Sequence, residues 1–161
     1  MNRQPTLQGE LVAVRPLRGD DFDELYTAGA DPLVWEQHPE PERWREDVFR
    51  AYFDDHLASG GALVVVDRAT GALIGVTRYA NYDPEASEVE IGWTFLGRPY
   101  WGGAYNADLK RVVLEHAFRT VETVVFLVGA DNLRSRRAVE KLGATETGER
   151  RRGLVVYALS S

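Results

Sequence analysis

The chain of 161 residues contains no cysteine. Disulfide bonds, thiolate nucleophiles and cysteine-ligated zinc sites are therefore excluded, and the composition fits a reducing compartment. Long apolar runs are missing too, because no stretch approaches the roughly 18–20 residues that span a bilayer. The N-terminal stretch MNRQPTLQGE also lacks the apolar segment of a signal peptide. We therefore expect a cytoplasmic protein without a membrane partner.

Positive charge is in short supply, with 19 Lys and Arg against 25 Asp and Glu and a net charge of −6. This balance argues against a nucleic-acid partner, and it suits a cationic substrate or simply an acidic cytoplasmic protein. His38, His56 and His116 are scattered without the spacing of metal ligands, so we expect no metal site. The length and the hydrophobic fraction of 44% predict a single domain, residues 1–161, with a sizeable core.

Hydrophobic periodicity predicts both strands and helices in the first half of the chain. GELVAVRPLR is typical of a strand, and a short helix capped by Asp20 or Asp21 follows it. We expect a loop with short helical pieces over residues 30–44 and then a helix that ends at Gly60. Residues 62–83 form two β-rich runs around the turn DRATG, which predicts a hairpin.

The second half alternates between strands and helices. SEVEIGWTFL predicts a strand with Val89, Ile91, Trp93 and Phe95 on one face and Glu88, Glu90, Gly92 and Thr94 on the other. A helix is expected after YWGGAY, a strand buried on both faces at TVVFLVGA, a capped helix at DNLRSRRAVEKLGA and a final strand at RRGLVVYALS. This order predicts an α/β sheet of mixed direction.

Two adjacent glycines stand directly before a predicted helix in RPYWGGAYN. A helix N-terminus has free N–H groups and a partial positive charge, and glycines let such amides approach an anion. The pattern matches neither G-x-x-x-x-G-K-[ST] nor G-x-G-x-x-G, which excludes a P-loop and a dinucleotide-binding fingerprint. The glycines alone indicate either a tight turn or a phosphate site.

Two further segments each allow two interpretations. In DNLRSRRAVEKLGA, the first interpretation is a helix that Asp131 or Asn132 caps and whose arginines are solvated. The second is a ligand site, to which Asn132 and Ser135 present polar groups. In EVEIGW, the first interpretation places Glu88 and Glu90 on a solvated strand face. The second places one of these carboxylates in a cleft, where it accepts a proton from a substrate.

Taken together, these segments resemble the GNAT acetyltransferases, in particular the RimJ/RimL-like branch. PYWGGAYNADL is similar to the family's acetyl-CoA pyrophosphate loop, with Gly102 and Ala104 at the small-residue positions, and NLRSRRAVEKLGA is similar to its Asn-led helix. The resemblance covers nearly the whole chain. It implies a GNAT-like α/β fold, in which a mixed, mostly antiparallel sheet has splayed central strands, EVEIGWTFL and TVVFLVG, and is flanked by helices.

The resemblance implies direct acetyl transfer from acetyl-CoA, as co-substrate, to a primary amine in a ternary complex. Glu90 is the expected base, with Glu88 second, and Ser135 is the expected donor to the departing thiolate. A backbone N–H near Trp93 is the expected donor to the oxyanion. The residues that the resemblance assigns to acetyl-CoA are Trp93, Thr94, Phe95, Leu96 and Asn132 at the pantetheine, Gly102, Gly103, Ala104 and Tyr105 at the pyrophosphate, and Ser135 near the thioester. Arg98 is a further candidate, as the nearby side chain that could contact a phosphate directly.

The sequence departs from the family pattern at several positions. Val139 stands where many members carry a tyrosine acid, Pro99 replaces the basic or Gln residue that starts the phosphate loop, and Ala144 replaces a Phe. The missing tyrosine keeps open an alternative function, a catalytically weak CoA-binding or sensory domain. A structural or interaction domain, in which the glycines only turn the chain, is the third alternative.

The loop before residue 45 is expected to wall the acceptor side of the site. Its candidate substrate residues are Trp35, Glu36, His38 and Trp44. The aromatic residues suggest an apolar lining, and Glu36 suggests a place for a cation. We expect a small-molecule or peptide amine as acceptor, and a monomer or homodimer as the assembly.

Overall fold

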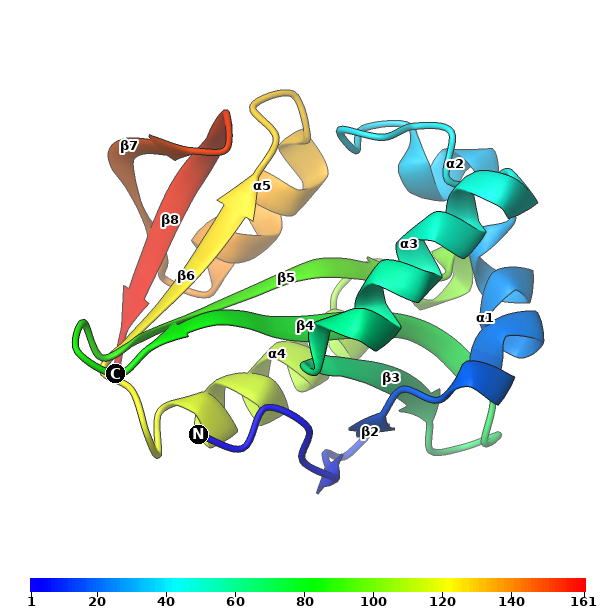
Figure 1. Cartoon of the computed structure of the whole chain (residues 1–161), viewed down its shortest axis with the longest axis horizontal. Helices are drawn as coiled ribbons and strands as arrows, with labels where there is room; N and C mark the ends of the chain where they lie inside the picture. The colour runs from blue at the N-terminus through cyan, green and yellow to red at the C-terminus, as the bar shows by residue number, and fades with distance from the viewer.

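A sheet of eight strands forms the middle layer of the protein, which a computed structural model describes over residues 1–161 (Figure 1). The strands lie in the order β1-β2-β3-β4-β5-β6-β8-β7, and only the β5–β6 pair is parallel. This confirms the expected mixed, mostly antiparallel α/β sheet. The strand bounds are β1 Leu7–Gln8, β2 Val12–Pro16, β3 Ala62–Asp67, β4 Leu73–Asp83, β5 Glu88–Leu96, β6 Thr123–Val128, β7 Thr145–Arg151 and β8 Leu154–Ser160.

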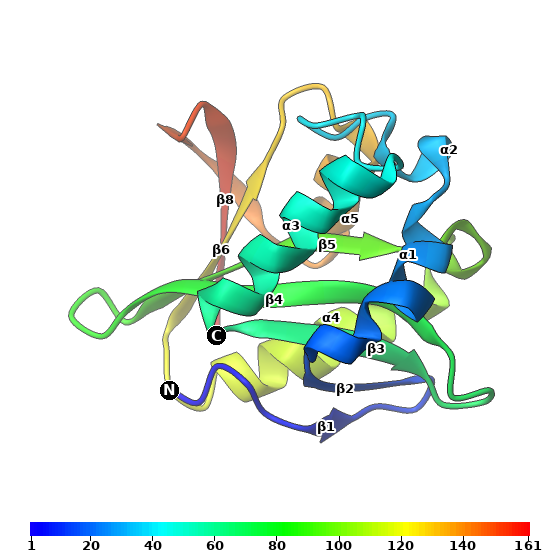
Figure 2. The same cartoon turned by 45° about the vertical axis from the view of Figure 1, so that its right-hand side comes forward.

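Helices cover both faces of the sheet (Figures 1 and 2). Helices α1, α2 and α3 lie on one face, and α4 and α5 lie on the other. Each face therefore has its own apolar core, because an amphipathic helix buries its apolar stripe against the sheet. The helix bounds are α1 Phe22–Gly29, α2 Pro32–Trp35, α3 Glu46–Ser59, α4 Ala104–Ala117 and α5 Leu133–Lys141, with 3₁₀ turns at Gly19–Asp21 and Arg98–Tyr100.

Most of the predicted elements are present, including the β3–β4 hairpin around DRATG. Strand β7 was not predicted. Its sequence TETGERR has no apolar alternation, and all of its residues except Arg151 are exposed. It forms by pairing with β8 at the edge of the sheet, so its conformation depends on a tertiary partner rather than on its own sequence.

The predicted alternation of side chains along β5 is wrong in its second half. Thr77 of β4 lies opposite both Trp93 and Thr94, which makes a β-bulge in β5. A one-residue insertion moves all later side chains to the other face of a sheet. Trp93 and Phe95 therefore pack in the core under α1–α3, whereas Val89 and Ile91 lie in the core under α4.

Strands β5 and β6 separate soon after they begin. Their parallel pairing starts at Glu88 and Thr123 and ends at Glu90 and Val125, although both strands continue beyond these residues. The part of the sheet that contains β6, β8 and β7 then stands at an angle to the part that contains β2–β5 (Figure 1). The separation confirms the expected splayed central strands, and it leaves backbone N–H and C=O groups that do not pair across the gap.

Asp108 fixes α4 to the N-terminal strands beside this gap. Its carboxylate accepts backbone N–H bonds from Glu10 at 3.2 Å, Leu11 at 2.8 Å and Val12 at 3.0 Å, and it pairs with Arg111 at 2.9 Å. Burial acts to raise the pKa of Asp108, but these hydrogen bonds outweigh it and hold the pKa below its usual value. The start of α4 therefore has a defined position next to the splayed strands.

Candidate functional site

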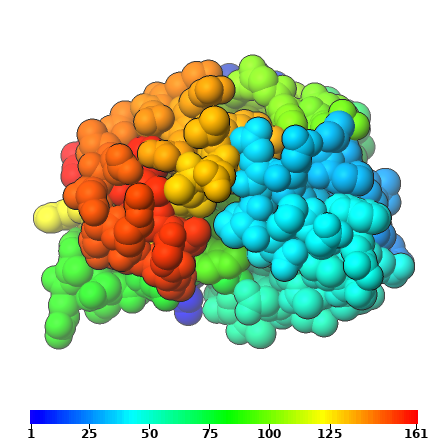
Figure 3. Space-filling model, turned by 90° about the horizontal axis from the view of Figure 1, so that it is seen from above, coloured from blue at the N-terminus to red at the C-terminus, as the bar shows by residue number.

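A cavity of about 760 Å³ occupies the gap between β5 and β6. The start of α4, one face of α5, the α2–α3 loop and the β7–β8 turn also line it. Figure 3 shows a hollow between the cyan α2–α3 segment, the gold segment after β6 and the red β7–β8 turn, with green atoms visible between them. The cavity brings together segments that lie far apart in the sequence.

Gly102 and Gly103 line the cavity immediately before α4. Their φ angles are 100° and 124°, a backbone conformation that residues with a side chain rarely adopt. A Cβ placed on either glycine would meet no atom within 4 Å apart from those of the adjacent residues. Backbone conformation, not crowding, therefore explains these glycines. No side chain caps α4 at Gly103, so the N–H groups of its first turn remain free for an anionic group.

Asn132 combines the two roles that the sequence left open. It is 3% exposed, it lines the cavity, and its Oδ1 accepts the N–H of Ser135 at 3.3 Å as the N-cap of α5. Its Nδ2 has no partner within the chain, which leaves that amide group available to a ligand. Ser135 and Val139 line the same cavity from α5, so the hydroxyl expected near the thioester is present and the tyrosine is absent.

Trp93, Thr94, Phe95 and Leu96 line the cavity from β5, as the resemblance implies. Trp93 has φ 51° at the bulge, and such a conformation persists only where the surroundings enforce it. The carbonyl of Trp93 accepts a hydrogen bond from the hydroxyl of Tyr52. The guanidinium of Arg78 lies 3.8 Å from the centroid of the Trp93 ring. His56 packs edge-on against Tyr52, and burial lowers the pKa of His56 to about 3, so this supporting residue is neutral.

Glu90 is the only carboxylate that lines the cavity. It is 4% exposed and accepts hydrogen bonds from Arg152 at 2.8 and 3.1 Å and from Asn81 at 2.8 Å. Glu88 pairs instead with Arg151 at 2.7 Å, outside the cavity lining. Of the two carboxylates considered from the sequence, Glu90 alone is placed to exchange a proton with a ligand in the cavity.

Lys110 projects from α4 into the cavity and has no anionic partner. Its Nζ lies 3.4 Å from the hydroxyl of Thr94 and 5.7 Å from the ring centroid of Phe126, and the residue is 6% exposed. Burial lowers the pKa of Lys110 from 10.5 to about 8. An unpaired ammonium in this position offers a hydrogen-bond donor to a ligand at the cost of its own desolvation.

The cavity is electropositive although the whole chain is acidic. Burial and the neighbouring Arg43 and Arg134 together lower the pKa of His38 to about 4, so its ring is neutral near pH 7. An anionic ligand is therefore favoured over a cationic one. Against the one carboxylate stand six cationic lining residues: Arg43, Lys110, Arg134, Arg137, Lys141 and Arg152.

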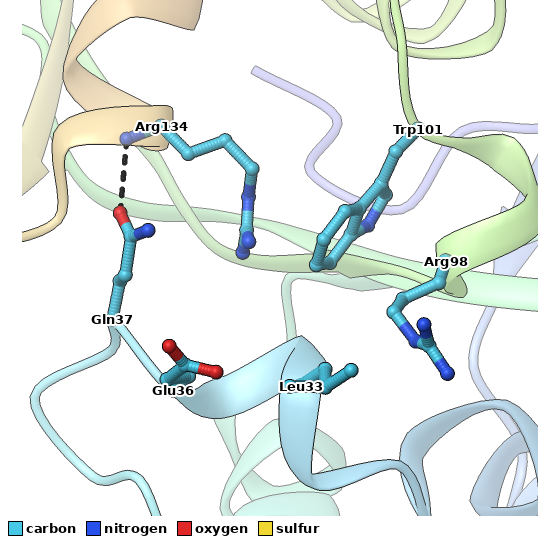
Figure 4. A pocket seen from close by; sticks show the side chains of 6 residues that line it. All are labelled: Leu33, Glu36, Gln37, Arg98, Trp101 and Arg134. Carbon is cyan, nitrogen blue, oxygen red and sulfur yellow. Dashed lines mark hydrogen bonds between the residues drawn. The ribbon is translucent and has the colours of Figure 1, made fainter.

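A second hollow, of about 350 Å³, shares Arg134 and Trp101 with the cavity (Figure 4). Arg98, the expected phosphate partner, lies in this hollow, pairs with Asp31 and does not line the main cavity. Arg134 has its guanidinium 3.7 Å from the ring centroid of Trp101 and makes no ion pair. Arg134 therefore occupies the place beside the glycine pair that the sequence analysis gave to Arg98.

The remaining expected site residues divide between the core and the surface. Trp35 is fully buried in the core under α1–α3, where its Nε1–H bonds to the carbonyl of Gly29, so its expected role in the acceptor wall is wrong. Glu36 lies in the second hollow, and Trp44 lines neither. Of the four residues proposed for the acceptor wall, only His38 lines the main cavity.

Ala104 and Tyr105 belong to the first turn of α4 but do not line the cavity. The hydroxyl of Tyr105 bonds to Asp67 at 3.2 Å, away from the gap. What these two residues offer to a ligand is therefore their backbone N–H groups alone.

Several lining residues were not predicted from the sequence, among them Lys110, Arg43 and Arg152. Lys110 had a signal, because it lies one turn after Asn106 and Ala107 and is a charged residue among buried positions of α4. Arg43 and Arg152 lie on loops without periodicity, and only the tertiary fold brings them to the cavity.

With this geometry in view, comparison with known proteins identifies the family. The family model described as "Acetyltransferase (GNAT) domain" matches residues 12–145. The chain belongs to the GNAT acetyltransferase family. Membership in this family implies acetyl transfer with acetyl-CoA as the acetyl donor. No curated protein matches the chain significantly.

Solved GNAT structures match almost the whole chain. A GCN5-related N-acetyltransferase from Brucella melitensis has 18% identity and a TM-score of 0.82, covering 98% of this chain and 79% of that one. An acetyltransferase from Agrobacterium tumefaciens str. C58 has 27% identity and a TM-score of 0.76, covering 98% and 95%. RimJ of Mycobacterium smegmatis, solved with CoA-disulfide, has 16% identity and a TM-score of 0.73, covering 98% and 86%.

The residues around the splayed strands fit the GNAT donor acetyl-CoA. Free amides before α4 suit its pyrophosphate, and the positive charge of Arg134 beside them suits its phosphates. The unpaired backbone of the gap and the free amide of Asn132 suit the hydrogen-bonding groups of the pantetheine. No group of three or more His, Asp or Glu residues is arranged to hold a metal ion, and none of the helices has the length and apolar character needed to cross a bilayer.

Proposed function

We propose that the protein is an acetyl-CoA-dependent N-acetyltransferase that moves the acetyl group directly to a primary amine within a ternary complex. One observation carries the proposal. The same cavity in the splayed sheet is lined both by the glycines before α4 and by the buried carboxylate of Glu90. A donor bound at those glycines and an amine next to Glu90 then share one space, which direct transfer requires.

In this proposal the donor lies along the gap between β5 and β6. The backbone of Trp93–Leu96 binds the pantetheine, and the N–H groups from Gly102 to Tyr105 bind the pyrophosphate. Asn132 donates its free amide to the pantetheine, while Arg134 adds positive charge beside the glycine pair. The free backbone groups at the splay and the open glycine pair support these assignments.

The chemical step assigns one task to each remaining polar residue. Glu90 takes a proton from the substrate ammonium, directly or through a water, and the amine nitrogen then bonds to the thioester carbon. A backbone N–H near Trp93 donates to the developing oxyanion. The carbon–sulfur bond breaks, and Ser135 hydrogen-bonds the departing sulfur, which takes up the second proton that the nitrogen loses as the amide forms. Lys110 offers a second donor in the same cavity.

We assign the protein to the RimJ/RimL-like branch, supported by the two motifs and by the fold shared with RimJ of Mycobacterium smegmatis. The proposal keeps the expectations of a cytoplasmic location and of a monomer or homodimer.

Calorimetry and a thiol-release assay test this function. Acetyl-CoA should bind the wild type at one site per chain, and a panel of primary amines should include at least one that releases CoA. Asn132→Asp keeps an oxygen for the helix cap but replaces the amide with a charge, so it should weaken acetyl-CoA binding without loss of folding. Failure of acetyl-CoA to bind would contradict the proposal.

Glu90→Gln separates the base from the binding site. This variant should lower turnover far more than it lowers acetyl-CoA affinity, and it should remove the acidic limb of the pH–rate profile. Glu88→Gln, outside the cavity, should be much milder. An unchanged pH–rate profile in Glu90→Gln would remove the assignment of Glu90 as base.

A second function, acyl-CoA binding without efficient turnover, is favoured by one observation. The carboxylate of Glu90 already accepts three hydrogen bonds from Arg152 and Asn81. Protonation of Glu90 would weaken these bonds, which makes it a poorer base. Val139 also removes the tyrosine that many relatives use. Tight acetyl-CoA binding with no CoA release for any amine would favour this second function.

A further inference from the structure

Arg43 is a cavity cation without an anion. Its guanidinium makes no ion pair and no side-chain hydrogen bond, and it lies 4.6 Å from the ring centroid of Tyr52 and 5.5 Å from that of Trp35. These aromatic rings hold it half-buried in the lining of the cavity. Stacking fixes the plane of the guanidinium while leaving its N–H groups free, which suits a planar carboxylate.

The lining of the cavity contains no free carboxylate that would balance the charge of Arg43. The only carboxylate of the cavity, Glu90, is bound by Arg152, and His38 is neutral near pH 7. The phosphates of the donor are assigned to the glycine pair and to Arg134, on other elements than the α2–α3 loop that carries Arg43. The acceptor side of the cavity therefore has one unpaired positive charge of its own.

The α2–α3 loop also closes one side of the cavity near Arg43. The side chain of Gln37 accepts the N–H of Arg134 at 3.2 Å, and Arg134 donates to the carbonyl of Val34 at 3.2 Å. Pro39 lies so close to Gly129 that a Cβ on that glycine would come within 3.3 Å of it. These contacts join the loop to the residues that follow β6, so an acceptor cannot enter between these two segments (Figures 3 and 4).

We propose that the acceptor is a small amine that also carries a carboxylate, that is, a free amino acid, whose carboxylate binds Arg43 while its amine faces Glu90. This inference rests on the proposed acetyl transfer and names its substrate class. It replaces the cationic acceptor that the acidic composition suggested. The bonds that form and break are those given above: nitrogen to carbon forms, carbon to sulfur breaks, and the ammonium proton leaves through Glu90.

The test is a thiol-release assay at saturating acetyl-CoA with matched acceptors. Each of the common L-amino acids is first assayed alone, and the best is then compared with its primary amide, its decarboxylated amine and a dipeptide that begins with it. For the wild type, kcat/KM for the acid should exceed that for the amide and the amine by about 10- to 100-fold, the value of hydrogen bonds to a charged group. The dipeptide should be a poor acceptor.

Variants at one position then assign the effect to Arg43. In Arg43→Gln the preference for the acid over the amide should fall towards one through a higher KM for the acid, while acetyl-CoA affinity measured by calorimetry stays unchanged. Arg43→Lys should keep part of the preference, because it keeps the charge but loses the planar fork. Arg45→Gln is the matched control, since Arg45 is exposed on the same loop, pairs with Asp47 and does not line the cavity.

Three outcomes would overturn the inference. Equal activity of the wild type with acid and amide would overturn it without any variant, so the test does not depend on the variants folding. A preference that survives in Arg43→Gln, or a dipeptide or protein N-terminus that outperforms every amino acid, would also overturn it. In all three cases the acetyl transfer itself stands, whereas absence of CoA release with every amine would overturn the proposed function and this inference together.

Discussion

Replacing Lys110 with methionine should make the protein more stable and worse at binding its donor. Methionine has a similar volume and length, and it removes an ammonium that is buried without an anionic partner. Burial lowers the pKa of Lys110 from 10.5 to about 8. Because each tenfold change in acidity corresponds to about 1.4 kcal/mol, the charged form costs about 3 kcal/mol of folding free energy at neutral pH.

The cost should depend on pH in a defined direction. Between about pH 8 and pH 10.5 the unfolded chain holds a proton on Lys110 that the folded chain has lost, so stability rises with pH across this window. Urea unfolding of ligand-free protein should therefore show Lys110→Met more stable than the wild type by about 3 kcal/mol at pH 7. That difference should narrow by about 2 kcal/mol near pH 10.

Lys141→Met is the control for this experiment, because Lys141 is the other lysine of the chain and is exposed. It should show neither the gain in stability nor its pH dependence. A difference between Lys110→Met and the wild type that stays constant with pH, or a loss of stability in Lys110→Met at pH 7, would refute the reasoning. Weaker acetyl-CoA binding by the stabilised variant would identify Lys110 as a residue kept for the ligand rather than for the fold.

Three further predictions concern other parts of the site and its support. Asp108→Asn should lower the free energy of unfolding by about 2–3 kcal/mol in urea titrations at neutral pH, because a charged acceptor of several hydrogen bonds is lost. The pKa of Asp108 is held below its ordinary value of 3.8, so its contribution to stability should be present above pH 3.8 and be lost as the pH falls through the folded-state pKa. Asp108→Asn should lack this loss of stability in acid. Gly103→Ala and Gly71→Ala, both at positive φ with open space around the Cβ, should each cost about 1–3 kcal/mol in the same titrations, but calorimetry should find weaker acetyl-CoA binding in Gly103→Ala alone. Tyr52→Phe removes the hydroxyl that binds the carbonyl of Trp93, and it should lower kcat more than it changes acetyl-CoA affinity; an unaltered kcat would argue against a role of Tyr52 in holding the bulge.

Much of the fold follows from local sequence signals. The β3–β4 hairpin and the two late helices have strong turn, cap and periodicity patterns, and the structure contains them. The exceptions have one cause in common, which is that a tertiary partner decides the conformation. Strand β7 exists because β8 lies beside it, and the bulge at Trp93 exists because Tyr52 and the neighbouring strand hold it.

The candidate site divides in the same way. The glycines before α4 and the cap at Asn132 were predicted, because each lies in a short motif with its own backbone requirement. The acceptor side was not, because a loop rich in aromatics does not indicate which residues turn inward. Trp35 is buried in the hydrophobic core, whereas Arg43 lines the cavity. No local sequence pattern distinguishes these two positions.

The most direct test of the account is a crystal structure of the protein with acetyl-CoA bound. The pantetheine should lie between β5 and β6, with the pyrophosphate at the N–H groups that follow Gly102 and the thioester within the space that Glu90 and Ser135 share. A donor bound elsewhere on the surface, with the gap between β5 and β6 left empty, would contradict it.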